Sequence, residues 1–227
     1  VVEFNDAEET VKYVKKIAQY QNIQRIVVVD NHSTDLKEVG LLKEIQDEKV
    51  VVLQSDRNGG YNYGNNFGIR YLKEQNEEYD CYIVSNPDIN IEEEAIDRCL
   101  QVLESDEKVG VVAPRMQDAN NQPIRRSSWK IRTFWRDVVH STRLLEVMFY
   151  PILRNGEYSQ KEYSKELLEV EAISGAFFII KREVLEQIGE FDENVFLFYE
   201  EDILAQKLKE KGYKTISVND VKFIHYE

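Results

Sequence analysis

The sequence contains few of the residues that build disulfide frameworks and metal clusters. Among its 227 residues there are only two cysteines and three histidines. Cys81 and Cys99 stand in apolar contexts and form no CxxC or Cys/His spacing, so we expect two buried thiols. The three histidines are too scattered to suggest a zinc cluster.

Long apolar runs are also missing. No uncharged apolar stretch approaches the roughly 18 residues of a membrane-spanning helix, and no secretory leader precedes the first strand-like segment, so a soluble cytoplasmic protein is expected. The sequence has 29 basic and 42 acidic residues. The resulting net charge of -13 repels polyanions, which argues against general nucleic-acid binding. The 42% hydrophobic content excludes a disordered chain.

What is present is a regular alternation of short β-branched runs with segments of helical period, which predicts an α/β sheet. As far as Pro114 the expected strands are 1–4, 25–30, 49–53, 81–84 and 109–112, and the expected helices are 7–20, 36–45, 62–75 and 91–103. Residues 115–169 are irregular, with one helix expected over about 134–153. Strands at 176–181 and 214–218 and helices at 183–188 and 200–211 complete the pattern.

Polar side chains follow four of the expected strands, in the segments Glu3–Asn5, Asp30–Ser33, Ser55–Asn58 and Ser85–Asp88. In open parallel sheets, ligands bind beyond the carboxyl ends of the strands. We therefore expect these segments to form one polar rim. The alternative is that each is an ordinary turn, because turns favour the same residues.

Glycines cluster in one place. Four of the ten glycines fall between Asn58 and Gly68. Between a strand and a helix, glycines let the backbone approach a ribose or a diphosphate closely, and Gly64 and Gly68 share one helix face that can pack tightly on the sheet. The segment is neither a P-loop nor a GxGxxG fingerprint. A tight turn without a ligand is the alternative.

Two acidic segments are candidates for chemistry. Pro87 biases Asn86 to extended geometry and so fixes Asp88, whose carboxylate could bind Mg²⁺ or Mn²⁺; the alternative is an Asn-Pro-Asp turn before a helix capped by Asn90. The run Glu200–Asp202 spans about 200° of helical arc, so at least one carboxylate faces inward and could act as a general base. The helix dipole alone would also favour acids there.

Together these segments resemble glycosyltransferase family 2, the inverting GT-A transferases, and in particular the rhamnosyltransferase-like branch of bacterial surface-polysaccharide enzymes. The resemblance covers nearly the whole chain. It rests on the order and spacing of the segments Val1–Asn5, Val28–Asp35, Asn58–Gly68, Asn86–Asp88, Ser174–Phe178, Phe191–Glu193 and Glu200–Asp202. It implies a single GT-A domain over residues 1–227, with a mainly parallel nucleotide-binding sheet in 1–112 and the irregular acceptor and catalytic half in 113–227.

The resemblance also implies roles for the matching residues. The nucleotide-sugar-binding positions would be Phe4, Asn5, Asp30, Asn58, Gly59, Gly60, Asn86, Ser174, Gly175 and Ala176. Asp30 would accept the imide N–H of a pyrimidine base. Asp88 stands in the last place of the DxD motif and would bind the metal, while Asn86 replaces the first Asp. His225, at the end of the last apolar run, could be a further metal ligand by its own chemistry, and a structural histidine is the alternative. Glu201 stands where the family has the Asp that serves as base, and a one-residue shift in register would give that role to Asp202.

The implied reaction is the metal-dependent transfer of a sugar from a UDP- or dTDP-sugar to a hydroxyl of a glycan or lipid-linked glycan. A nucleotide-sugar-binding domain without turnover is the alternative, because fold does not imply function. A nucleotidyltransferase is the last alternative, because the segment Glu3–Asn5 at the end of the first expected strand has no glycine-rich loop with a basic residue.

A basic island lies in the irregular middle of the acidic chain. It consists of Arg125, Arg126, Lys130, Arg132, Arg136, Arg143 and Arg154. Interleaved aromatic and aliphatic residues suggest an amphipathic surface for a lipid-diphosphate acceptor or for peripheral contact with the inner face of a membrane. A core-packed helix or a dimer contact is the alternative, and the oligomeric state stays open.

Overall fold

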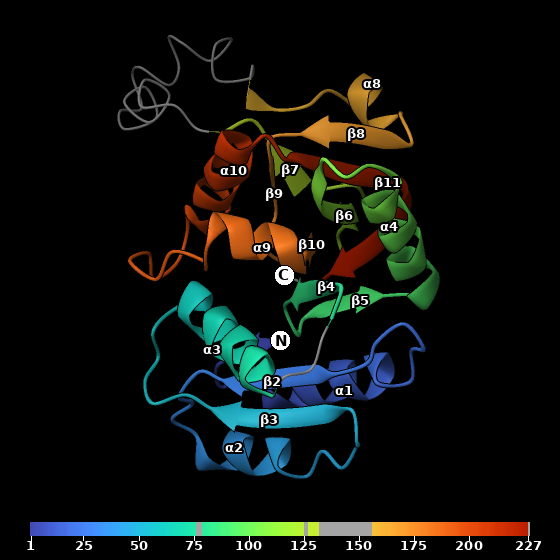
Figure 1. The fold of residues 1–227 in the computed structure, drawn as a ribbon. Coiled ribbons are helices and arrows are strands. Elements are labelled where there is room, and N and C mark those ends of the chain that lie inside the picture. The colour runs from blue at the N-terminus through green and yellow to red at the C-terminus, as the bar shows by residue number, and fades with distance from the viewer. Residues whose placement is uncertain (76–78, 125–126, 132–155, 227) are drawn as a thin grey trace, which may run out of the picture.

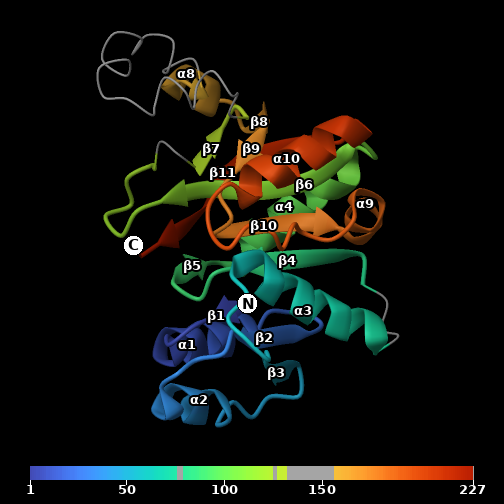
Figure 2. The same ribbon diagram turned by 90° about the vertical axis from the view of Figure 1, so that its left-hand side faces the viewer.

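The computed structural model describes residues 1–75, 79–124, 127–131 and 156–226, and an α/β architecture runs through them (Figure 1). The helix expected over 134–153 lies outside the described residues, as does the whole basic island except Lys130. In both views, the sheet that contains β3 (Val50–Gln54) lies near one end of the molecule and α10 (Glu200–Lys211) lies near the other (Figures 1 and 2).

The N-terminal sheet is parallel. Its strands are β1 (Val2–Glu3), β2 (Ile26–Asp30) and β3, in that order. The helices that accompany it are α1 (Ala7–Ile17), α2 (Leu36–Leu42) and α3 (Tyr61–Glu74). Every residue of β2 is buried, as expected for a parallel strand that is covered on both faces.

The second sheet is mixed. Its strands are β4 (Cys81–Ser85), β5 (Ile89–Ile91), β6 (Val109–Gln117), β8 (Leu167–Val170), β10 (Phe177–Lys181) and β11 (Lys214–His225). The order is β4-β10-β6-β11-β5, with β8 paired to β11. Strand β10 runs antiparallel to β4 and β6, whereas β11 runs parallel to β6. Further elements are α4 (Glu93–Ser105), α8 (Gln160–Tyr163), α9 (Arg182–Ile188), and the pair β7 (Ser128–Trp129) and β9 (Ala172–Ile173).

Most of the expected elements are present, but β7, α8 and most of β8 lie in the stretch 115–169 that was expected to be irregular, and β11 continues to His225 where a strand over 214–218 was expected. A further difference follows Pro87. The sequence predicts a helix from residue 91, but Ile89–Ile91 form β5 and the helix begins at Glu93 with Glu92 as its N-cap. Asn90 therefore lies in a strand and does not cap the helix. Strand β5 forms because it pairs with β11, which lies more than a hundred residues further along the chain.

Strand β10 separates two hydrophobic clusters. Phe177 and Ile179 pack in a cluster with residues of α1 and α4, whereas Phe178 and Ile180 pack in a cluster with residues of α9 and α10. Consecutive side chains of a strand point to opposite faces, so the four-residue run covers both sides. The antiparallel register then sets Phe177 opposite Ser85, which brings the start of β10 to the end of β4.

Candidate functional site

Three distant parts of the chain meet where β4 ends. Asn86, the residue after β4, donates its N–H to the carbonyl oxygen of Ala176 at 2.8 Å. One residue earlier, Gly175 donates its N–H to Oε1 of Glu201 at 3.2 Å. The turn of residues 174–176 therefore connects the segment that carries Asp88 to the first turn of α10. The structure brings together, at one edge of the mixed sheet, the positions expected to bind metal and to act as base.

Asp88 is paired with His225. Nε2 of His225 lies 3.2 Å from Oδ2 of Asp88, because the β5–β11 register places His225 opposite Ile89. This contact with His225 is the main reason that the pKa of Asp88 is held below its ordinary value, against the opposing effect of burial. The Asp88 carboxyl is therefore ionised at neutral pH.

The free oxygen of Asp88 fits a divalent cation. Oδ1 is buried and has no hydrogen-bond partner among the described residues. Carboxylate oxygens are the ligands that Mg²⁺ and Mn²⁺ prefer. Within the described ranges no three His, Cys, Asp or Glu side chains form a metal group of their own. A cation at Asp88 would therefore take further ligands from water or from a bound phosphate.

Glu201 and the residues beside it have different surroundings. Partial burial, and then the charge of Glu200, raises the pKa of Glu201 above its ordinary value. Asp202 is buried and accepts a hydrogen bond from the indole Nε1 of Trp129 at 3.3 Å. Glu201 thus faces the 174–176 turn, whereas Asp202 faces β7. Of the two acids, Glu201 is the one that the fold directs toward Gly175.

A second pair of carboxyl groups lies at the carboxyl ends of β1 and β2. Asp30 is 1% exposed; its Oδ1 accepts the N–H of Ser33 at 2.7 Å and its Oδ2 accepts from Nε2 of Gln54 at 2.9 Å. Glu3 lies opposite Asp30 in the parallel register and accepts the hydroxyl of Ser33 at 3.1 Å. Burial raises the pKa of Glu3 to about 7, the N–H of Asp6 lowers it, and the charge of Asp30 adds to the rise.

Sequence reasoning missed this pair, because Glu3 appeared only as one polar residue after a strand. A signal was available, because each of these acids directly follows a run of valines in an expected strand, and the parallel register places the two opposite each other. Phe4 is exposed beside them, and the side chain of Asn5 accepts the backbone N–H groups of Thr34 and Asp35. Asn5 therefore stabilises the loop after β2 in this structure.

The glycine turn before α3 is held by two asparagines. Oδ1 of Asn58 accepts the N–H of Gly60 at 3.2 Å and the Nδ2 of Asn31 at 3.1 Å. Asn31 also donates to the carbonyl of Gly60. Gly60 has a left-handed φ of 89°, and a Cβ there would lie 2.2 Å from the carbonyl oxygen of Phe196. This position requires glycine for both reasons.

Replacing Gly60 with alanine is therefore expected to lower the free energy of unfolding by roughly 2 to 4 kcal/mol. Gly40 offers a matched control, because it lies inside α2 and a Cβ there would meet nothing within 4 Å. Gly40→Ala is expected to raise stability by about 0.5 to 1 kcal/mol. Urea unfolding of both variants checks the pair, and shifts of equal sign and size would contradict the assignment.

Two asparagines of α3 bind the backbone of a distant segment. Nδ2 of Asn62 donates to the carbonyl of Asp192, and Asn66 both donates to the carbonyl and accepts the N–H of Phe191. These asparagines thus hold the segment that leads to α10. Gly64 and Gly68 pack against the sheet as expected, since a Cβ at Gly64 would lie 2.6 Å from a methyl carbon of Val2 and one at Gly68 3.2 Å from a methyl carbon of Val29.

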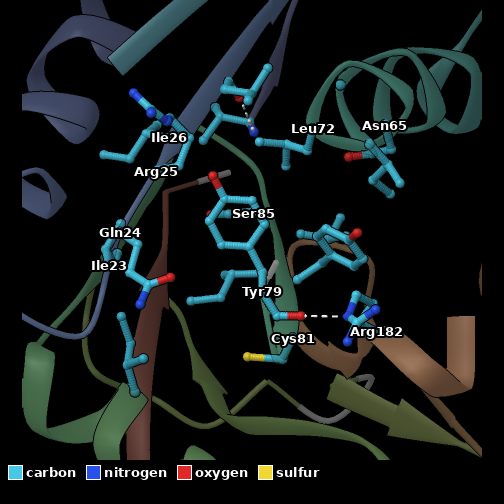
Figure 3. A pocket seen from close by; sticks show the side chains of 18 of the residues that line it. Ile23, Gln24, Arg25, Ile26, Asn65, Leu72, Tyr79, Cys81, Ser85 and Arg182 are labelled. Carbon is cyan, nitrogen blue, oxygen red and sulfur yellow. Dashed lines mark hydrogen bonds between the residues drawn. The ribbon is translucent and has the colours of Figure 1, made fainter. Parts of the chain in front are cut away.

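A cavity of about 550 Å³ lies elsewhere, and its lining includes residues of β2, α3 and β4. Figure 3 shows Ile23, Gln24 and Ile26 on one wall, and Tyr79 and Cys81 on another. None of the expected site residues lines it, so neither Asp88 nor Glu201 borders this cavity. We therefore place the candidate site at the carboxyl ends of the strands, where polar groups converge.

Comparison with known proteins is consistent across three kinds of match. The family model described as "Glycosyl transferase family 2" matches residues 2–189. The low-salt glycan biosynthesis hexosyltransferase Agl10 of Haloferax volcanii is 28% identical over 220 residues, covering 96% of this chain and 64% of the relative. The N-acetylglucosaminyl-diphospho-decaprenol L-rhamnosyltransferase of Mycobacterium tuberculosis is 24% identical over 211 residues, covering 89% of this chain and 66% of the relative. The chain thus spans just under two thirds of these relatives.

Two solved structures share the fold. GalNAc-T7 with UDP, GalNAc and Mn²⁺ superposes with a TM-score of 0.68 at 14% identity, over 100% of this chain and 42% of that one. The mannosyltransferase PcManGT from Pyrobaculum calidifontis, in complex with GDP-Man and Mn²⁺, superposes with a TM-score of 0.62 at 19% identity. The match covers 99% of this chain and 55% of that one. The expected GT-A fold is confirmed by these neighbours.

Proposed function

Because the chain belongs to glycosyl transferase family 2, we propose that it transfers a sugar from a nucleoside-diphosphate sugar to an acceptor hydroxyl with inversion at the anomeric carbon. The observation that carries this proposal is the connection of the Asn86–Asp88 segment to Glu201 through the 174–176 turn, made by the bond from Asn86 to Ala176 and the bond from Gly175 to Glu201. A carboxylate that could bind a metal and a carboxylate that could act as base would then lie at one sheet edge, as displacement of a diphosphate from a sugar requires.

In the proposed reaction Glu201 accepts the proton of the acceptor hydroxyl. The acceptor oxygen then bonds to the anomeric carbon, and the bond from that carbon to the diphosphate oxygen breaks. The raised pKa of Glu201 suits a general base, because proton affinity increases with pKa. Ser174 and Ala176 flank Gly175 beside this carboxylate, so we propose that they line the sugar and acceptor.

Asp88, with His225, would hold Mg²⁺ or Mn²⁺. The buried Oδ1 without a hydrogen-bond partner among the described residues supports this assignment, as does the Mn²⁺ named with both solved relatives. A divalent ion bound there supplies Lewis-acid stabilisation of the negative charge on the leaving diphosphate. Asn86, whose side chain also helps to lower the pKa of Asp88, would lie beside the donor.

The donor base is proposed to lie over the ends of β1 and β2. Phe4 supplies an exposed ring, and the turn formed by Asn58, Gly59 and Gly60 would adjoin the ribose and diphosphate. Asp30 Oδ2 already accepts an amide N–H from the exposed Gln54, the same kind of donor that a pyrimidine imide presents. We therefore propose UDP or dTDP as the carrier.

The acceptor is proposed to be a lipid-linked glycan of a surface polysaccharide. Four consecutive apolar residues directly before α10 are largely exposed, at 60% for Phe196, 51% for Leu197, 70% for Phe198 and 46% for Tyr199. They adjoin the base, and the mycobacterial relative is named for a decaprenol-linked substrate. Because these four side chains are exposed, we propose that this loop makes peripheral contact with a membrane. No helix in the described part of the chain is long and apolar enough to cross a membrane.

A thermal-shift panel of sugar nucleotides with Mn²⁺, followed by a transfer assay, tests the proposal. A donor at one hundred times its Kd should stabilise the protein by about 2.7 kcal/mol, and adding acceptor should release nucleoside diphosphate. Stabilisation by donor without release of nucleoside diphosphate would indicate a domain that only binds the sugar nucleotide. This is the second candidate function, and the presence of Asn86 in place of an acid favours it. A protein that no donor stabilises would contradict both.

The rate of transfer is expected to depend on pH through Glu201. Since its pKa lies above the ordinary value, the base becomes protonated, and transfer is lost, at a higher pH than for an exposed glutamate. The kcat should therefore increase with pH through an acidic limb above about 4.5. A pH profile of kcat at saturating donor measures this limb, and a rate that is flat down to the ordinary range of glutamate would contradict the base assignment.

A further inference from the structure

Tyr61 is fixed in an unusual place between the two halves of the site. It is the first residue of α3, and its backbone N–H donates to the carbonyl of Phe196 at 3.1 Å. The preceding Gly60 permits this contact, because any side chain there would collide with the same carbonyl. Tyr61 thus enters the site from the glycine turn while its backbone is held by the loop that leads to α10.

The hydroxyl of Tyr61 contacts the turn that holds Glu201. It donates to the carbonyl oxygen of Gly175 at 2.6 Å, while the N–H of the same glycine donates to Oε1 of Glu201 at 3.2 Å. A Cβ on Gly175 would lie 3.4 Å from that Oε1 and 3.5 Å from Cε1 of Tyr61. Gly175 is therefore enclosed by the tyrosine ring on one side and by the carboxylate on the other.

A glycine needs such support more than any other residue. Without a Cβ, Gly175 has the widest choice of backbone angles, so the direction of its N–H is not fixed by its own sterics. The hydrogen bond from Tyr61 fixes the carbonyl of Gly175 and so restricts the ψ rotation that relates this carbonyl to the peptide plane carrying the N–H. Burial raises the pKa of Tyr61, and the nearby charges of Glu201, Glu200 and Asp88 add to the rise, so the hydroxyl remains a donor.

We propose that Tyr61 is a positioning residue for the transfer reaction: by holding the carbonyl of Gly175 it aims the N–H of Gly175 at Glu201 and so orients the base. This inference rests on the proposed function, in which Glu201 takes the acceptor proton. Tyr61 itself touches neither reacting atom in this scheme. Its contribution is to the geometry and to the proton affinity of Glu201, because a hydrogen bond to a carboxylate lowers its pKa.

The test is Tyr61→Phe, which keeps the ring against Gly175 and removes only the donor. We expect kcat to fall by roughly tenfold to a hundredfold, with the KM for the donor changed by less than about twofold because the diphosphate contacts remain. The weakened Gly175 bond should move the acidic limb of kcat to higher pH. Tyr213→Phe is the matched control, since Tyr213 donates its hydroxyl to the exposed Gln187 of α9, and it should change neither quantity.

A second measurement tests whether Tyr61 acts on Glu201 and does not require turnover. In protein carrying ¹³C-labelled glutamate, the carboxyl signal lost in Glu201→Gln identifies Glu201, and its titration is followed by NMR in the wild type and in Tyr61→Phe. A higher pKa in the variant supports the positioning role. An unchanged titration overturns it, whatever the rate. A wild type that transfers no sugar would sink the proposed function alone, because the titration still reports whether Tyr61 acts on Glu201.

Discussion

Glu201→Gln is expected to lower the rate of sugar transfer by roughly two to four orders of magnitude, the usual contribution of a general base. The glutamine amide has nearly the shape of the carboxyl group, and its oxygen can still accept the N–H of Gly175. What it cannot do is accept the proton of the acceptor hydroxyl. Donor binding should therefore stay close to that of the wild type.

The measurements are nucleoside diphosphate release with acceptor present and thermal shift with donor alone. Glu210→Gln is the control, because Glu210 lies on the same helix and its carboxylate contacts only the exposed Gln206 among the described residues. A Glu201→Gln variant within about threefold of the wild-type rate would remove Glu201 from the base role. If Asp202→Asn lost transfer instead, the base would be the acid that now faces Trp129.

Asp88→Ala is expected to weaken donor binding in the presence of Mn²⁺ by roughly a hundredfold or more, and to leave the weak binding without metal unchanged. The reason is that Asp88 is the acidic side chain at the end of β4 with a buried oxygen that has no hydrogen-bond partner among the described residues. The pKa of Asp88 is held low by His225, so the loss should be the same across the neutral range.

The control for this experiment must also remove one negative charge. A chain with a net charge of -13 attracts Mn²⁺ by its overall field, and this general attraction must be separated from binding at Asp88. Asp97→Ala meets that need, since Asp97 is exposed on α4 and accepts only the side-chain amide of Asn22 among the described residues. Calorimetric titration with a sugar nucleotide, with and without Mn²⁺, compares the two. Equal affinities for Asp88→Ala and Asp97→Ala in Mn²⁺ would show that the cation does not bind at Asp88.

The sequence predicted well wherever local pattern determines structure. The apolar run Ile26–Val29 and the helical face with Gly64 and Gly68 are set by side-chain period alone, and both lie where expected. Strand β5 was missed because its three residues form a strand only through pairing with β11. The partner of Asp202 was equally out of reach, since Trp129 lies 73 residues away in the chain.

The roles of the asparagines in α3 show why the candidate site was predicted only in part. A cluster of Asn and Gly residues after a strand is typical of a ligand loop, but Asn62 and Asn66 instead bind the backbone of residues 191 and 192. No sequence pattern distinguishes an amide that binds a ligand from one that binds a distant loop. The positions of Asp88 and Glu201, in contrast, depend on strand ends and helix starts, which the pattern indicates.

The asparagine contacts of α3 also limit how this enzyme family can be recombined. The loop that leads to α10 has its backbone groups at residues 191 and 192 bound by side chains from the other half of the chain. A chimera that joined residues 1–112 of this protein to the second half of a relative would keep α10 anchored in this way only if that relative's loop presented the same backbone groups to Asn62 and Asn66. Exchange of the second half between relatives therefore requires a compatible α3.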